Sequence, residues 1–89
     1  MRGRYFHVGD AEFISDEGEE FKLLYYIGME EIAYCIKVER VAQDGSLTTE
    51  ESQGITSCLN EAEDLVKTLV QWAITPVCLL GVIDDLMGA

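Results

Sequence analysis

The chain has 89 residues, a length that fits one folded domain. Seventeen acidic residues against six basic ones give a formal net charge of -11, which disfavours binding to nucleic-acid phosphates and to anionic membrane surfaces. Apolar residues make up 48% of the chain and charged residues 26%, a balance that is typical of globular proteins and excludes wholesale disorder.

The sequence contains no segment that predicts secretion or membrane insertion. Arg2 and Arg4 are not followed by an apolar run, so we expect no secretory signal. The longest uncharged stretch, residues 68–83, is shorter than the roughly 20 residues that a membrane-spanning helix needs. The three cysteines have no paired spacing, which favours reduced, buried thiols and therefore a cytoplasmic location.

The first part of the chain has the residue pattern of an antiparallel meander. Residues 5–14 predict an irregular strand with a bulge or turn at Gly9-Asp10. Residues 21–27 are almost all apolar, which predicts a strand covered on both faces. Residues 32–40 alternate between an apolar and a mixed set of side chains, the period of a strand.

A hairpin turn and a polar strand complete the predicted sheet. The Asp44-Gly45 pair is a signal of a tight turn between two strands. Residues 47–54 are rich in threonine and glutamate, which suits the edge of a sheet because charged side chains there discourage stray pairing.

The last third of the chain predicts two helices. Apolar residues recur at steps of three and four over residues 60–74, and Asn60 with Glu63 resembles a capping box. The Thr75-Pro76 pair ends this helix and begins a second one, because proline excludes the preceding residue from the helical region and suits the first helical position.

Strands followed by helices predict an α+β fold. We expect a single domain over residues 1–89, with an antiparallel three- to four-stranded meander in residues 5–54. The two C-terminal helices, at about 60–74 and 76–87, are predicted to pack on one face and one end of this sheet.

The C-terminal part of the chain resembles a family of short, uncharacterised Firmicute proteins that is classified as a domain of unknown function. The hairpin at Asp44-Gly45 and the amphipathic helix fit this resemblance. The resemblance implies a fold with a C-terminal helix–Thr-Pro–helix tail, and it implies no activity. The matching segments are Ile55-Thr56-Ser57, Thr75-Pro76-Val77-Cys78-Leu79 and Val82-Ile83-Asp84-Asp85-Leu86.

No combination of residues in the sequence predicts catalysis. His7 is the only histidine, and the order of nucleophiles and carboxylates around it matches no catalytic triad. The carboxylates of residues 10–20 fail the spacing of a calcium loop, because Ser15 occupies the position that requires glycine. We therefore predict no enzyme activity, no catalytic, cofactor-binding or metal-ligating residue, and no cofactor.

An excess of apolar surface favours a protein-interaction module. Two helices do not easily cover both faces of a sheet whose strand 21–27 is apolar on both faces, so we expect one face to bind a second copy in a homodimer. The residues proposed for the interface are Leu24, Tyr25, Tyr26, Tyr34, Asp84 and Asp85.

Other functions stay open at this point. The acidic segment 10–20 is a candidate binding site for a ligand or a metal ion. The net charge alone suits an acidic decoy that occupies a basic, nucleic-acid-binding partner. A further, unidentified protein partner is also compatible with an interaction module, whereas nucleic acid and membranes are not expected as partners.

Overall fold

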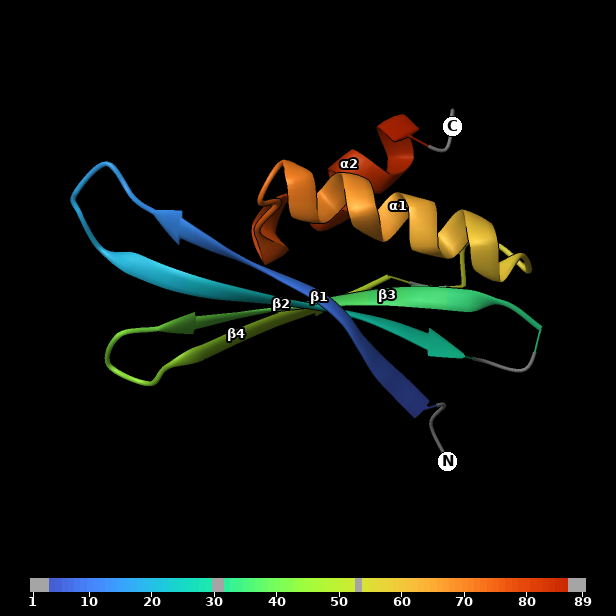
Figure 1. Cartoon of the computed structure of the whole chain (residues 1–89), viewed down its shortest axis with the longest axis horizontal. Helices are drawn as coiled ribbons and strands as arrows, with labels where there is room; N and C mark the ends of the chain where they lie inside the picture. The colour runs from blue at the N-terminus through green and yellow to red at the C-terminus, as the bar shows by residue number, and fades with distance from the viewer. Residues whose placement is uncertain (1–3, 30–31, 53, 87–89) are drawn as a thin grey trace.

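The computed structural model describes residues 4–29, 32–52 and 54–86, which form a four-stranded antiparallel sheet with helices on one face (Figure 1). The strands lie in the order β1-β2-β3-β4, so each strand pairs with its neighbour in the chain. The α+β class, the meander and the two C-terminal helices are confirmed. The bounds of the strands are β1 (Arg4–Ile14), β2 (Glu20–Met29), β3 (Tyr34–Ala42) and β4 (Leu47–Glu51).

β1 contains a bulge in its first half. Its register with β2 shifts between His7 and Gly9, so that Val8 is the extra residue. The irregularity predicted at Gly9-Asp10 is therefore a bulge that lies one residue earlier. Because a bulge changes the alternation of side chains by one, Phe6 before it and Gly9 after it face the same side of the sheet.

The predicted hairpin turn joins β3 to β4. Gly45 has a φ of 90°, a left-handed conformation that glycine adopts without steric cost. The carboxylate of Asp44 accepts hydrogen bonds from the hydroxyl of Ser46 at 2.7 Å and from its backbone N–H at 2.9 Å. These bonds, the one from the hydroxyl first, hold the pKa of the Asp44 carboxyl below its usual value. β4 then forms the polar edge strand that the sequence predicts.

A helical layer of three elements covers one face of the sheet (Figure 1). Its first helix begins without the predicted capping box, because Asn60 already lies inside the first turn and Cys58 is the N-cap residue. The Thr56 hydroxyl takes over part of the capping: its oxygen accepts a 3.1 Å bond from the N–H of Cys58, and it donates to the Glu61 carboxylate. The three elements are α1 (Leu59–Gln71), the 3-10 turn η1 (Pro76–Cys78) and α2 (Leu79–Leu86).

α1 ends at Gln71, before the predicted residue 74, because a Schellman motif stops it. Ala73 is left-handed with a φ of 51°. Its N–H bonds to the carbonyl of Val70 at 3.1 Å, and the N–H of Ile74 bonds to the carbonyl of Leu69 at 3.0 Å. The chain is thus turned back toward the sheet, and α2 starts a new direction. Within the described part of the chain, none of the helices has the length and apolar character needed to cross a bilayer.

The hydrophobic core lies between the helical layer and the sheet. Alternate residues of β2 and β3 supply its sheet side, and one stripe of α1 with two residues of α2 supplies its helical side. Pro76, which starts η1 as predicted, is also buried. The core side chains are Leu23, Tyr25, Ile27, Ile36, Val38, Ala62, Leu65, Val66, Leu69, Leu79 and Ile83.

The opposite face of the sheet, here called the open face, carries no helix or strand of the described chain (Figure 1). Leu23, Tyr25 and Ile27 of β2 enter the core. Leu24 and Tyr26 alternate with them, lie on the open face and are half-buried. Within the described chain, this strand is therefore covered by other elements on one face only.

Candidate functional site

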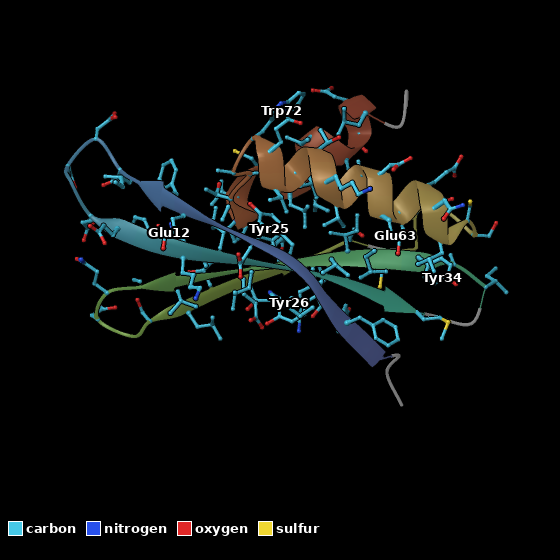
Figure 2. The ribbon with its side chains drawn as sticks, in the orientation of Figure 1. Glu12, Tyr25, Tyr26, Tyr34, Glu63 and Trp72 are labelled. Carbon is cyan, nitrogen blue, oxygen red and sulfur yellow. The ribbon has the colours of Figure 1, made fainter. Side chains whose placement is uncertain are left out.

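Four of the residues predicted for an interface lie on the sheet, which separates them into two pairs. Leu24 and Tyr26 lie on the open face. Tyr25 is fully buried in the core, and Tyr34 packs against the same core. Figure 2 shows Tyr25 between the sheet and the helices and Tyr26 on the other side of the sheet. The structure therefore removes Tyr25 from any surface that a partner contacts.

The two acidic residues predicted for the interface lie on a different element. Asp84 and Asp85 are exposed on α2, and neither forms an ion pair with another described residue. Arg40 lies on the sheet, on β3. It donates a 3.3 Å hydrogen bond to the Thr48 hydroxyl and lies 4.8 Å from the centre of the Phe21 ring.

The open face carries a connected group of side chains from all four strands. The Nζ atom of Lys37 lies 4.4 Å from the centre of the Tyr5 ring and 4.7 Å from that of Tyr26, so the ammonium has two aromatic partners. Lys37 is also 3.5 Å from Oε2 of Glu39, and the Tyr26 hydroxyl donates a 3.0 Å bond to Oε1 of the same carboxylate. We call Tyr5, Tyr26, Lys37, Glu39 and Glu51 the tyrosine–lysine cluster.

Tyr5 reaches across the sheet because its partner in β2 is Gly28. A Cβ atom at Gly28 would lie 2.5 Å from a carbon of the Tyr5 ring and 2.9 Å from Sγ of Cys35. The bare backbone thus leaves room for the ring, and the Tyr5 hydroxyl donates a 2.7 Å bond to Glu51 on β4. Burial, followed by the bond to Glu51, raises the pKa of Tyr5 well above its ordinary value. The cluster therefore ties β1 to the far edge of the sheet.

His7 lies at the margin of this cluster. Its ring packs edge-on against Tyr26 with the ring centres 5.6 Å apart, and its Nε2 lies 3.8 Å from Oδ2 of Asp10. Both side chains of this pair are about half exposed (50% and 53%), so their attraction is screened by water. The residues that the structure describes contain no group of three or more histidine, cysteine, aspartate or glutamate side chains arranged to hold a metal ion.

The three thiols differ in exposure. Cys35 is buried beside Tyr5, whereas Cys58 and Cys78 are exposed, and all three are free. The expectation that all three are buried was therefore wrong for two of them. Cys58 is the N-cap residue of α1 and Cys78 is the last residue of η1.

A second candidate site lies on the side of the molecule where β1 forms the edge of the sheet. A groove of about 530 Å³ runs between β1 and α1. Its helical residues recur at steps of three and four, so they form one stripe along α1. We call it the β1–α1 groove, and it is lined by Val8, Gly9 and Asp10 of β1 and by Glu63, Val66, Lys67, Val70 and Gln71 of α1.

Gly9 and the bulge give this groove its shape. A Cβ atom at Gly9 would lie only 2.9 Å from Cγ2 of Val70, so glycine is what allows α1 to approach β1 this closely. The extra residue, Val8, lines the groove opposite the helix. The sequence predicts the irregularity in β1 but not the groove. A glycine inside a strand pattern was the available signal, because it often marks a close approach of another element.

Comparison with known proteins identifies a family and no characterised relative. No curated protein and no solved structure matches the chain. The family model of DUF6514, which is described as a family of unknown function, matches residues 5–89. This match includes β1 and so covers more of the chain than the resemblance seen in the C-terminal part. The chain therefore belongs to DUF6514, a family of unknown function.

Proposed function

We propose that this protein is a non-enzymatic interaction module that forms a homodimer through its open face. The observation that supports the proposal is the arrangement of that face. Leu24 and Tyr26 lie on β2, one of the two central strands, and are half-buried. The neighbouring charges on β3, Lys37 and Glu39, already pair with each other and with Tyr26. Tyrosines with an apolar body and a bonded hydroxyl are common at the centre of protein interfaces.

The size of the open face suits a small dimer interface. Strands lie about 4.8 Å apart and rise about 3.3 Å per residue, so four strands of this length present a flat area of roughly 600 Å². Side-chain relief increases the accessible area beyond this value. A standard interface buries about 800 Å² on each partner, which is of the same order.

The charges of the open face also suit a second copy. Lys22 is exposed and forms no ion pair with any described residue. Glu12 lies opposite it on β1, on the same face of the sheet. Two copies related by a two-fold axis can each place Lys22 near a carboxylate of the other copy, which is the reciprocity that such a dimer requires. The free thiols support the proposal that the dimer acts in the reducing cytoplasm.

Light scattering coupled to size-exclusion chromatography tests the dimer. We expect a mass of about twice the 9.9 kDa of one chain at micromolar concentration. Leu24→Glu places a charge at the centre of the open face without entering the core, and it is expected to give a folded monomer. Val77→Glu is the matched control, because Val77 is 82% exposed on the helical side. A monomeric native protein, or a dimer that survives Leu24→Glu, contradicts the proposal.

A further inference from the structure

The sheet has two edges, and only β1 is suited to accept another strand. β4 has five residues, of which two are threonines and two are glutamates, a composition that protects an edge. β1 has eleven residues. Its outer side presents backbone N–H and C=O groups that no strand of the described chain pairs with. An extended segment that adds to β1 gains these hydrogen bonds.

The β1–α1 groove lies beside this edge and has an apolar floor. Val66 is 2% exposed and belongs to the core, Val70 is half-buried, and Val8 is 42% exposed. Side chains of a strand alternate between the two faces of a sheet, so every second residue of an added strand would point toward the helical side and into this groove. The floor selects apolar, β-branched side chains at those positions.

The bulge decides which half of β1 pairs with an added strand. Residues 4–7 and 9–14 are out of phase, so a regular strand follows only one of the two segments. The groove is lined by the beginning of the second segment. In that segment Asp10 and Glu12 face the open side of the sheet. The residues of an added strand that point to the open side would therefore lie next to two carboxylates.

The charges beside β1 favour a different protein, rather than a second copy of this chain, as the source of the added strand. Asp10 and Glu12 are both exposed, and Glu63 adds a third carboxylate at the rim, against the two ammonium groups of Lys67 and of Lys22, which lies opposite Glu12 on β2. A second copy of β1 would place its own Asp10 and Glu12 beside these acids, which disfavours self-pairing. Basic side chains are favoured instead, and the net charge of -11 attracts a basic segment from a distance.

We infer that the β1–α1 groove binds an extended basic segment of a partner protein, in which lysine or arginine alternates with valine or isoleucine, by strand addition to β1. The basic side chains lie against Asp10 and Glu12, and the apolar ones enter the groove next to Val8 and Val70. The apolar groove lies on the helical side of the sheet, whereas Asp10 and Glu12 face the open side, so this surface meets the proposed homodimer interface along β1. Val8→Lys distinguishes the two proposals, because it changes the groove and leaves the side chains of the open face in place.

Fluorescence anisotropy of the full chain with a labelled seven-residue peptide of alternating lysine and valine tests this inference. We expect saturable binding. A peptide of the same charge with proline at its centre has one backbone donor fewer and a broken strand, and it is expected to bind at least 10-fold more weakly. Equal binding of the two peptides would show attraction by charge alone and would overturn the inference.

Two pairs of variants locate the site. Val8→Lys obstructs the groove and Val77→Lys adds the same charge on the helical side, so only the first is expected to weaken binding at least 10-fold. Asp10→Asn and Asp84→Asn remove one exposed carboxylate each and leave the core untouched. We expect weaker binding for Asp10→Asn only. Equal effects within the aspartate pair would place the peptide elsewhere, whether or not Val8→Lys folds.

Discussion

The hydroxyl of Tyr25 donates a 2.9 Å hydrogen bond to the carbonyl oxygen of Ile74, the residue whose N–H completes the Schellman motif of α1. Tyr25 lies in the middle of β2 and is 0% exposed. One partly buried hydrogen bond thus connects the centre of the sheet to the point where the chain leaves α1 for η1.

Removal of this hydroxyl tests its contribution. Tyr25→Phe is expected to lower the free energy of unfolding by about 1–2 kcal/mol, because the partly buried carbonyl of Ile74 loses its donor. Urea unfolding followed by circular dichroism measures the change. Tyr34→Phe is the control, since the Tyr34 hydroxyl makes no hydrogen bond with a described residue, and a change below about 0.5 kcal/mol is expected. Equal losses in the two variants would show that the bond contributes nothing.

The raised pKa of Tyr25 leads us to expect a loss of stability at alkaline pH. Burial raises the pKa of Tyr25 from 10.0 to about 12, so the folded state keeps its phenol proton at pH values where the unfolded chain releases it. The associated stability is fully present below pH 10 and is lost as the pH rises from 10 toward 12. Tyr5 and Tyr26 contribute in the same direction.

Unfolding at a series of pH values checks this dependence. Tyr25→Phe is expected to flatten the decrease above pH 10 without abolishing it, because the two tyrosines of the open face remain. A decrease as steep as in the native protein would mean that Tyr25 ionises equally in the folded and unfolded states.

Gly28 and Tyr5 are expected to be energetically coupled. Gly28→Ala places a methyl group 2.5 Å from the Tyr5 ring and is expected to cost about 1–3 kcal/mol, because the ring has to leave its place over the strand. Tyr5→Ala removes the closest obstacle and leaves Sγ of Cys35 at 2.9 Å. The double variant should therefore be more stable than the sum of the two single effects predicts, by about 1 kcal/mol. Additive effects in urea unfolding would show that the ring moves aside freely.

Ala73 offers a stabilising substitution. Its φ of 51° carries a steric cost for any residue with a Cβ atom, so Ala73→Gly is expected to raise the free energy of unfolding by about 0.5–1 kcal/mol. Ala62→Gly, in the interior of α1, is expected to lower it by about 1 kcal/mol or more. Thermal unfolding of the two variants should show melting temperatures that move in opposite directions. A lower melting temperature for Ala73→Gly would contradict the prediction.

The local signals of the sequence identified most of the secondary structure. Asp44-Gly45 and Thr75-Pro76 define the hairpin and the start of η1 because their own backbone preferences decide these places. The two ends of α1 were harder to predict from the sequence. Asn60 has the side chain of a cap residue, yet the helix begins one residue before it. Ala73 gives no sign of a left-handed residue, because glycine is the usual signal.

The candidate sites depend on pairing between strands, which a single segment does not reveal. Residues 21–27 are almost all apolar, and Lys22, which shares the face of Tyr26, is the one charged side chain in them that separates Tyr26 from Tyr25. The clearer distinction comes from β3, where Lys37 lies opposite Tyr26 and Val38 lies opposite Tyr25. The β1–α1 groove is still harder to predict from the sequence, because its shape depends both on the bulge in β1 and on the close approach of α1 at Gly9.

The extra residue at Val8 marks a place where the length of the chain can vary in this family. His7 and Gly9 already pair with consecutive residues of β2, so removal of the residue between them would leave Phe6 and Gly9 on the same side of the sheet. The tyrosine that crosses to Glu51 would also keep its side. A family member with a one-residue deletion between His7 and Gly9 is therefore expected to lose the bulge and keep this cross-sheet tie.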